Sequence, residues 1–277
     1  MRLSILGFPL SHSLSPAMHN AALREVGLSD WRYEAMPIEP ARLSEAVQLI
    51  RGDDYAGANV TVPHKEKIMP LLDGVTPVAE AIGAVNTIVK RDGKLIGHNT
   101  DAAGLLADLH THGVKIQDRV VLVLGAGGSA RAAVAACAGM GAKIKFIARR
   151  RDQAESLASD FQLPTSNVFD LTINDLTRAS HDCALILNCT PLGMSPNIDS
   201  SPWFDSVPFP KEAFVYDLVY NPRETKLVKQ ARAQGLSAAT GLGMLIEQGA
   251  LGFELWTGKD APRKVMREAA EEKMKGK

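Results

Sequence analysis

Several features that would mark a specialised class of protein are missing from this chain of 277 residues. Lysine plus arginine and aspartate plus glutamate both number 31, so no net basic field favours nucleic acid or an anionic membrane. No apolar run approaches the roughly twenty residues that cross a bilayer. Internal repeats, low-complexity tracts and zinc-ligand spacings are also absent from the sequence. With 45% hydrophobic and 22% charged residues, the composition is ordinary for a soluble globular protein and fits an enzyme.

Cysteine is scarce, and its three positions are Cys137, Cys183 and Cys189. An odd number in apolar segments favours neither a disulfide framework nor a metal site, which is typical of a reducing cytoplasm. Residues 1–7 predict a first strand and are too short for a signal peptide. We therefore expect a cytoplasmic protein.

The most informative motif lies in the middle of the chain, where a β-branched run over 120–124 ends at a glycine turn. The turn reads Gly125-Ala126-Gly127-Gly128-Ser129-Ala130 and opens an Ala-rich segment that predicts a helix. Such a strand–turn–helix directs backbone N–H groups at a phosphate. Gly125 would make the tight turn, Gly127 would leave room for a pyrophosphate, and Ala130 would let the helix pack on the strand. A purely structural turn between strand and helix remains the alternative.

A run of three arginines predicts which dinucleotide binds. A second strand is expected over 143–148, about twenty residues past the glycines, where NAD-binding chains place an acidic residue. This chain instead has Arg149, Arg150 and Arg151, whose guanidinium groups suit a 2′-phosphate. The sequence therefore predicts NADP(H). The alternative for these arginines is a solvated, positively charged start of the next helix. Asp152, which follows them, leaves NAD open as the cofactor.

The hydrophobic patterning predicts an α/β protein with two domains. We expect strands over 3–6, 58–62, 85–89, 95–97, 120–124, 143–148, 184–188, 214–218 and 236–239, and helices over 16–26, 41–51, 101–112, 224–234, 243–257 and 262–274. An N-terminal substrate-binding and catalytic domain (1–101) would precede a Rossmann-type dinucleotide domain (102–242), and the C-terminal helices (243–277) would pack back on the first domain. Ser15 and Pro16 are expected to be the N-cap and a first-turn residue of the first helix.

Two ionisable residues before the dinucleotide unit are candidates for proton transfer. Hydride delivery to a carbonyl leaves charge on oxygen, which a positioned acid must neutralise. Lys65 follows the expected strand 58–62, and Asp101 begins the helix that leads into the second domain. The lysine would act as the acid, and the aspartate would orient it. A solvated loop lysine and a helix N-cap are the alternatives for these two residues.

Eight ordered motifs resemble the shikimate dehydrogenase family along nearly the whole chain. They lie at 11–16 (SHSLSP), 57–65 (GANVTVPHK), 83–87 (GAVNT), 99–104 (NTDAAG), 125–130, 188–194 (NCTPLGM), 216–222 (YDLVYNP) and 241–248 (GLGMLIEQ). The resemblance implies NADPH-dependent, reversible reduction of 3-dehydroshikimate to shikimate, in aromatic amino acid (chorismate) biosynthesis. It implies an active site in a cleft between two α/β domains, and a monomer or homodimer.

The resemblance also assigns roles to individual residues. Lys65 and Asp101 resemble the catalytic pair, and Ser13 and Ser15 resemble the pair that holds the substrate carboxylate. The remaining substrate contacts implied by the resemblance are Asn59, Thr61, Asn86, Tyr220 and Gln248, with Lys65 and Asp101 themselves. The implied cofactor contacts are Gly125, Ala126, Gly127, Gly128, Ser129, Ala130, Arg149, Arg150, Thr190, Leu218, Gly241 and Met244. Backbone bonding by Asn86 and Gln248, and core packing by Tyr220, Leu218 and Met244, remain the alternatives.

One departure from the family concerns the cofactor. NADPH-using members commonly have Asn-Arg-Thr after the second cofactor strand and a further arginine nearby, whereas this chain has Ala148-Arg149-Arg150, then Arg151 and Gln153. A quinate/shikimate dehydrogenase relative that prefers NAD is therefore the alternative function. Ser13 and Ser15 favour the narrower biosynthetic enzyme. A catalytically silent ligand sensor is an alternative of another class, against which the intact Lys65 and Asp101 argue.

Overall fold

The computed structural model describes residues 1–275 and divides the chain into two compact units. Unit 1 combines residues 1–104 with the C-terminal segment from Leu245 onward, and unit 2 comprises Leu105–Met244. The prediction of an α/β fold whose C-terminal helices return to the first unit is confirmed. The chain leaves unit 1 within helix α4 (Asp101–Thr111) and re-enters it within α9 (Leu242–Thr257).

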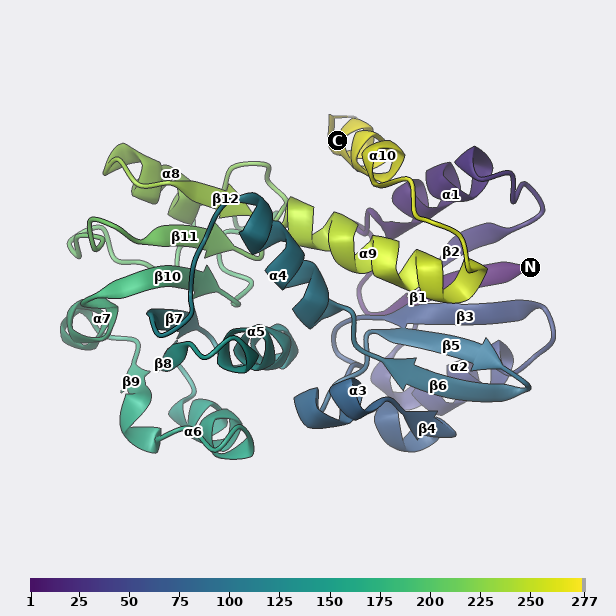
Figure 1. The fold of residues 1–277 in the computed structure, drawn as a ribbon, viewed down its shortest axis with the longest axis horizontal. Helices are drawn as coiled ribbons and strands as arrows, with labels where there is room; N and C mark the ends of the chain where they lie inside the picture. The colour runs from purple at the N-terminus through teal and green to yellow at the C-terminus, as the bar shows by residue number, and fades with distance from the viewer. Residues whose placement is uncertain (276–277) are drawn as a thin grey trace. The chain divides into compact units, whose positions relative to one another are not determined.

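Unit 1 is built on a six-stranded mixed sheet in the order β2-β1-β3-β5-β6-β4 (Figure 1). Its strands are β1 (Arg2–Gly7), β2 (Arg32–Pro37), β3 (Tyr55–Val60), β4 (Gly74–Val75), β5 (Thr87–Arg91) and β6 (Lys94–His98). β1 runs parallel to β2 and β3, whereas β5 is antiparallel to both β3 and β6. The predicted hairpin around Asp92 and Gly93 is therefore confirmed, and both residues have the positive φ that its tight turn needs.

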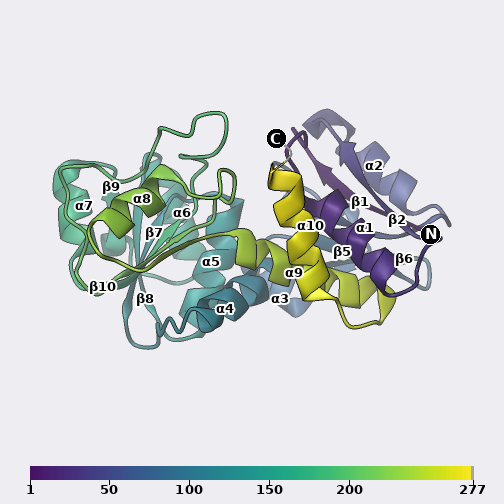
Figure 2. The same cartoon turned by 90° about the horizontal axis from the view of Figure 1, so that it is seen from above.

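Helices cover the sheet of unit 1. They are α1 (Ser15–Glu25), α2 (Leu43–Ile50), α3 (Pro77–Ile82) and α10 (Arg263–Lys275), with most of α9 and short 3₁₀ turns at Pro40–Arg42 and Met69–Leu71. α2 buries Leu43, Val47 and Ile50 against strand residues that include Leu6 and Ile88. The i, i+4 and i+7 spacing of these three residues is what predicted the helix. α10 lies beside α1 in two perpendicular views (Figure 1, Figure 2).

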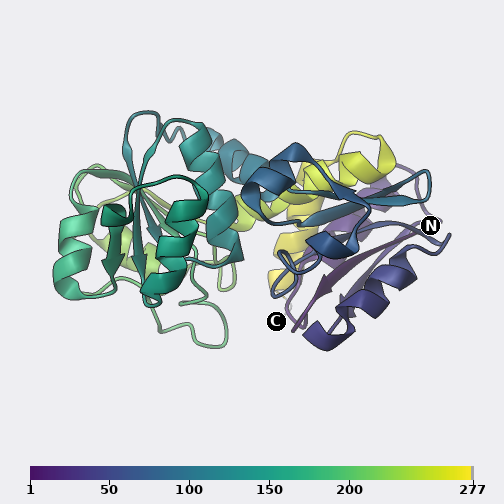
Figure 3. The ribbon, with the colours of Figure 1, turned by 90° about the horizontal axis from the view of Figure 1, so that it is seen from below.

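Unit 2 is a six-stranded parallel sheet in the order β12-β11-β10-β7-β8-β9. Its elements are β7 (Val120–Leu124), α5 (Gly128–Gly139), β8 (Lys143–Ala148), α6 (Arg151–Asp160), a 3₁₀ turn (Thr165–Asn167), β9 (Val168–Asp170), α7 (Ile173–Ser180), β10 (Cys183–Asn188), β11 (Phe214–Asp217), α8 (Lys226–Ala233) and β12 (Ala238–Thr240). Helices lie on both sides of this sheet in the view from below (Figure 3). The strand order is that of the doubly wound dinucleotide fold, which reverses direction between β7 and β10.

A long connection without helix or strand joins β10 to β11, and its aromatic residues complete one core of unit 2. Trp203 and Phe209 stack with their ring centroids 4.2 Å apart, and the Trp203 indole donates to the carbonyl of Val207 at 2.8 Å. Both rings pack with Ile186 and Val215 of the sheet. The connection is therefore anchored by burial although it has no regular structure.

Several elements differ from the sequence expectations. The strand expected over 58–62 spans Tyr55–Val60, because the chain turns ahead of Pro63. β2, β4, α3, α6, β9 and α7 were not predicted. α6 buries only Ala154, Leu157 and Ala158, and β2 is an edge strand with alternating exposure, so neither has a strong apolar pattern. Among residues 1–275, no helix combines the length and apolar character needed to span a bilayer.

The prediction that Ser15 caps α1 is wrong. Leu14 occupies the cap position with helical dihedral angles (φ −89°, ψ −13°), and no side chain caps the helix. Ser15 therefore lies in the first turn, together with Pro16, and its side chain is buried. An N-cap needs extended backbone at the residue before the helix, and the chain already turns into helix one residue earlier.

His19 of α1 is buried in an aromatic cluster. His19 stacks on Tyr33 at 4.3 Å and meets the Trp256 ring edge-on at 5.4 Å. Neither of its ring nitrogens has a partner within the described residues. Burial lowers the pKa of His19 from 6.5 to about 3, so the folded protein keeps this ring neutral.

We predict that His19→Phe makes the protein less sensitive to acid. Below pH 6.5 the unfolded chain protonates this histidine while the folded protein does not, so stability falls as the pH drops toward 3. At pH 5 this loss amounts to about 2 kcal/mol, and phenylalanine removes it while keeping an aromatic ring in the stack. Urea unfolding at pH 7.5 and pH 5.0 measures the difference. An equal pH dependence in both proteins would show that His19 is protonated in the folded state.

Candidate functional site

The two ionisable residues singled out by the sequence form a buried ion pair in unit 1. Lys65 lies in the turn after β3, and Asp101 is the first residue of α4. The Lys65 Nζ donates to Asp101 Oδ2 at 2.6 Å, and the two side chains are only 12% and 8% exposed. The alternative of a solvated lysine is therefore wrong. Asn99 Oδ1 accepts from the Asp101 backbone N–H at 3.0 Å, so the Asp101 carboxylate is used for side-chain contacts rather than for capping.

Asn86, which lies directly before β5, is the centre of the polar cluster around this pair. Its Nδ2 lies 2.8 Å from Asp101 Oδ1, 2.9 Å from Thr100 Oγ1 and 3.2 Å from Gln248 Oε1. Its Oδ1 accepts from the Thr100 backbone N–H at 2.8 Å, which fixes the orientation of the amide. Asn86 is 2% exposed. Its amide therefore orients the Asp101 carboxylate and joins it to α9.

Gln248 reaches the cluster from α9, 162 residues further along the chain than Asn86. Its Nε2 donates to the carbonyl of Leu245 at 2.8 Å, and its own backbone carbonyl accepts from Thr100 Oγ1 at 3.0 Å. Gly104 on α4 allows this contact, because a Cβ there would lie 2.7 Å from the Gln248 nitrogen. The C-terminal segment thus brings a half-buried amide to the residues around Asp101.

Asn59 and Thr61 lie at the carboxyl end of β3, on the same segment as Lys65. Asn59 Nδ2 donates to the Asn86 carbonyl and to Thr87 Oγ1, both at 3.1 Å, and its Oδ1 accepts from the Tyr33 hydroxyl at 2.6 Å. Both amide hydrogens of Asn59 are therefore used within the protein, and its oxygen keeps one free lone pair. Thr61 is half-buried and packs against Gly7. A Cβ on residue 7 would overlap the Thr61 methyl group.

The two serines in the loop before α1 play different structural parts. Ser13 is half-buried, and its Oγ accepts from the Ser15 backbone N–H at 3.3 Å. Ser15 is buried. The alternative in which Ser15 caps the helix and Ser13 has no local contact is therefore wrong. No side chain caps α1, and Ser13 accepts the backbone N–H of Ser15.

In unit 2, the glycine turn joins β7 to α5. Gly125 has a φ of +102°, and a Cβ on it would lie 2.9 Å from the Thr190 methyl carbon. Gly127 is the N-cap of α5, and the position of its missing Cβ has no neighbour within 4 Å. Ala130 is buried. α5 has neither a side-chain cap nor an acidic residue in its first turn, whereas Thr76, Thr172 and Thr225 cap α3, α7 and α8. α5 shares this lack of a side-chain cap with α1, α2 and α6.

The three arginines after β8 are not equivalent. Arg151 begins α6 and pairs with Glu155 at 2.8 Å and with Asp170 at 3.3 Å. Arg149 and Arg150 are exposed, and within residues 1–275 neither has an acidic partner. These two guanidinium groups therefore remain available to a phosphate, whereas Arg151 is already neutralised.

A buried polar network supports the loop after β10, next to the glycine turn. Thr190 donates its hydroxyl to Asn188 Oδ1 at 2.7 Å, and Asn188 Nδ2 donates to Asp217 Oδ1 at 2.8 Å. Thr225 and the Val219 backbone also donate to Asp217, at 2.6 and 3.0 Å. Burial raises the pKa of Asp217 to about 6 although these bonds oppose it. The network fixes Thr190, and through its methyl group it fixes one wall of the turn at Gly125.

The remaining predicted contacts of unit 2 follow β11 and β12. Gly241 packs so closely on Leu218 that a Cβ would overlap the Leu218 carbonyl oxygen. Met244 is buried, and its backbone N–H donates to the Tyr216 hydroxyl at 3.3 Å, which itself donates to Asp108 at 2.6 Å. Burial raises the pKa of Tyr220. Leu218 is half-buried. These positions lie after the carboxyl ends of parallel strands, where ligands bind in such sheets.

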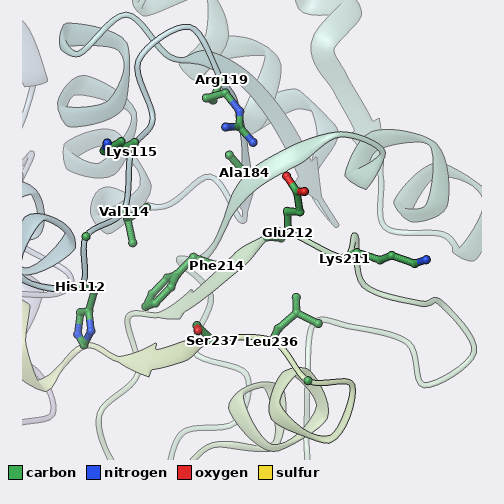
Figure 4. Close-up of a pocket in the computed structure, with 13 residues that line it drawn as sticks. His112, Val114, Lys115, Arg119, Ala184, Lys211, Glu212, Phe214, Leu236 and Ser237 are labelled. Carbon is green, nitrogen blue, oxygen red and sulfur yellow. The ribbon is translucent and has the colours of Figure 1, made fainter.

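A pocket of unit 2 lies at the amino-terminal ends of the sheet strands, opposite the ends that carry the glycine turn (Figure 4). Arg119, Ala184 and Phe214 line it, and each lies at the start of a strand. Lys211 extends away from the other labelled side chains. Because ligands of doubly wound sheets bind at the carboxyl ends of strands, this pocket is not the predicted cofactor site.

Several residues of these networks were missed by the sequence. Thr87, Thr100 and Asn99 lie within or beside the quoted motifs, and Asn188 and Asp217 do so in unit 2, so motif membership could have indicated them. Tyr33 lies outside every motif and gives no such signal. What distinguishes Tyr33 is the hydrogen bond from its hydroxyl to Asn59, which only the folded chain makes.

Comparisons with known proteins agree with this geometry. Residues 5–88 match the family model described as the shikimate dehydrogenase substrate binding domain, and residues 241–271 match the shikimate 5'-dehydrogenase C-terminal domain. The NADP(+) shikimate dehydrogenase of Symbiobacterium thermophilum is 46% identical over 274 residues, which cover 97% of this chain and 92% of that protein.

Solved structures extend the likeness to the fold. Shikimate 5-dehydrogenase from Thermus thermophilus, in complex with NADP(H) and shikimate, is 38% identical with a TM-score of 0.89 and covers 99% of both chains. Quinate dehydrogenase from Corynebacterium glutamicum, in complex with NAD, is 28% identical with a TM-score of 0.87 and covers 98% of this chain and 99% of its own. By motifs, fold and full-length similarity, this chain belongs to the shikimate dehydrogenase family.

Proposed function

We propose that this protein is an NADP-dependent shikimate dehydrogenase, which reduces 3-dehydroshikimate to shikimate reversibly. The observation that carries the proposal is the buried Lys65–Asp101 pair within the Asn86 cluster, in a chain 46% identical to a shikimate dehydrogenase. A full ion pair with oriented amides is suited to acid–base chemistry on a polyhydroxylated ligand. A silent sensor has no need of this pair.

In this mechanism Lys65 donates a proton to the carbonyl oxygen of the substrate while a hydride reaches the carbonyl carbon. When bound, NADPH supplies that hydride. Asp101 holds the lysine ammonium at 2.6 Å, and Asn86 holds the carboxylate in turn. Lys65 is thus positioned before the substrate arrives, which lowers the entropic part of the barrier. In the reverse direction, the same lysine accepts the proton from the substrate hydroxyl.

The other predicted contacts complete the proposal. Ser13 and Ser15 bind the carboxylate, and Asn59, Thr61, Asn86 and Gln248 recognise the ring hydroxyls. Tyr220 contacts the substrate beside the nicotinamide, and Leu218, Gly241 and Met244 contact the nicotinamide end. Gly125–Ala130 and Thr190 hold the pyrophosphate, and Arg149 with Arg150 holds the 2′-phosphate. The uncapped start of α5 and the two exposed arginines support an anionic dinucleotide with an additional phosphate.

An NADPH-oxidation assay tests the proposal directly. We expect rapid oxidation with 3-dehydroshikimate, slower oxidation with NADH, and weak NADP+ reduction with quinate. Faster turnover with NAD and quinate would favour the quinate-type alternative. A folded protein that binds shikimate but turns over neither cofactor would be a sensor.

We predict that Lys65→Ala loses turnover but retains substrate binding. A general acid acts on the transition state, so kcat should fall on the order of a hundredfold or more while KM changes little. Steady-state kinetics with shikimate and NADP+ measure both constants. Lys67→Ala, an exposed lysine two residues on, is the matched control and should behave like the native enzyme. A near-normal kcat for Lys65→Ala would remove this residue from the mechanism.

We predict that replacing Arg149 and Arg150 together with glutamine weakens NADPH far more than NADH. Only NADPH carries the 2′-phosphate, and losing a charged hydrogen bond costs roughly 1.5–3 kcal/mol. The KM for each cofactor measures the effect. Arg151→Gln is the control from the same run, because Arg151 is already paired with Glu155 and Asp170 and should affect both cofactors alike. Equal losses in the double variant would mean that these arginines form only a solvated surface.

We predict that Ser13→Ala and Ser15→Ala both raise the KM for shikimate, with little loss of thermal stability. Because Ser15 does not cap α1, its substitution lacks the roughly 1 kcal/mol penalty of a lost cap. Ser4→Ala, a buried serine of β1 whose hydroxyl has no partner in the described structure, is the control. A shikimate analogue with an amide in place of the carboxylate should bind the native enzyme poorly. Equal binding of acid and amide would place the carboxylate elsewhere.

A further inference from the structure

Tyr33 on β2 makes contacts through its backbone, its ring and its hydroxyl, although the sequence predicted no role for it. Asn20 of α1 donates to the Tyr33 carbonyl at 2.8 Å and accepts from the Tyr33 backbone N–H at 2.9 Å. The ring stacks on His19 and lies 6.2 Å from Trp256. The side chain is 2% exposed. Its backbone, ring and hydroxyl are thus fixed independently, which is more restraint than packing alone requires.

The hydrogen-bond directions around Tyr33 follow from simple accounting. Asn59 Nδ2 donates to the Asn86 backbone carbonyl, which can only accept, so the Asn59 oxygen must face Tyr33. The Tyr33 hydroxyl therefore gives its single hydrogen to Asn59, at 2.6 Å.

We propose that Tyr33 is a positioning residue for the substrate, which holds the side-chain oxygen of Asn59 in place for a ring hydroxyl. The inference rests on the proposed function, because it takes Asn59 as a substrate contact. The Tyr33 hydroxyl occupies one lone pair of the Asn59 oxygen and leaves the other for the substrate.

The environment of Tyr33 suits this role. Burial raises the pKa of its hydroxyl well above 10, so the group remains a neutral donor over the working pH range. Within residues 1–275, the Tyr33–Asn59 bond is also the only bond that the structure gives to the Asn59 oxygen. Removing the hydroxyl would leave that buried oxygen without its donor and remove one of the three bonds that hold the amide.

Tyr33→Phe tests the inference, with Tyr55→Phe as the matched control. Tyr55 is also a buried tyrosine of the same sheet, but its hydroxyl has no partner in the described structure. We expect Tyr33→Phe to raise the KM for shikimate about tenfold and to change kcat less than about twofold, since one hydrogen bond is lost from binding. Tyr55→Phe should keep the native KM. A native KM for Tyr33→Phe, or an equal rise in both variants, overturns the inference.

A double-mutant cycle separates positioning from general packing. If Tyr33 acts through Asn59, adding Tyr33→Phe to Asn59→Ala should raise KM less than about threefold further. A second tenfold rise would mean that the two residues act independently, and the inference would be wrong.

Fluorine NMR gives a test that keeps the tyrosine ring. The chain has four tyrosines, so 3-fluorotyrosine labelling yields four resonances, assigned with the Tyr55, Tyr216 and Tyr220 phenylalanine variants and, by elimination, Tyr33. Because a ring hydroxyl that donates to the Asn59 oxygen changes the acceptor of the Tyr33 hydroxyl, the Tyr33 resonance should shift with shikimate and saturate at its Kd. The Tyr55 resonance should stay in place. A Tyr33 resonance unchanged at saturating shikimate overturns the inference, even if Tyr33→Phe does not fold.

The outcome is distinguishable from failure of the proposed function. If the native protein neither binds shikimate nor reduces NADP+ with it, the proposed function fails before any variant is compared. If the native protein is active and Tyr33→Phe matches Tyr55→Phe, only the role of Tyr33 fails.

Discussion

The buried ion pair between Lys65 and Asp101 is the contact on which the polar interior of unit 1 depends. Two opposite charges 2.6 Å apart and almost out of solvent lose hydration that their attraction does not replace unaided. Asn86 supplies a further bond to the carboxylate, and Thr100 fixes Asn86. The same cluster then extends through Asn59 to Tyr33. One electrostatic requirement thus orders polar groups from β3, β5, α4 and α9.

In unit 2, by contrast, some positively charged groups lack acidic partners among the described residues. The first turn of α5 has no side-chain cap and no acidic residue, and Arg149 and Arg150 are exposed without an acidic partner among the described residues. The nearby carboxyl of Asp217 is buried, accepts three hydrogen bonds and has a pKa raised to about 6. Under the proposed function, the anionic dinucleotide would lie at the switch point between β7 and β10 and would supply the missing partners.

Relatives of this chain include both shikimate and quinate dehydrogenases, so the shared fold does not by itself determine the substrate. In this chain, the groups that would distinguish the two are amides and hydroxyls with few free hydrogen-bonding positions. Asn59 has one lone pair of its side-chain oxygen to offer. Under the proposed function, such a site would discriminate by leaving its own buried groups unpaired when the wrong ligand binds.

The sequence alone determined the elements with a strong local pattern: the glycine turn after β7, the amphipathic α2, the hairpin at Asp92 and Gly93, and the motifs that carry Lys65 and Asp101. It missed α6 and β2, whose apolar residues are few, and it misplaced the start of α1 by taking Ser15 as a cap. Only the tertiary structure paired Asn86 with Gln248, 162 residues away, and showed that Arg151 is neutralised by Glu155 and Asp170. The reason is physical: local propensity acts within a few residues, whereas hydrogen-bond and ion-pair partners are selected by packing between segments far apart in the chain.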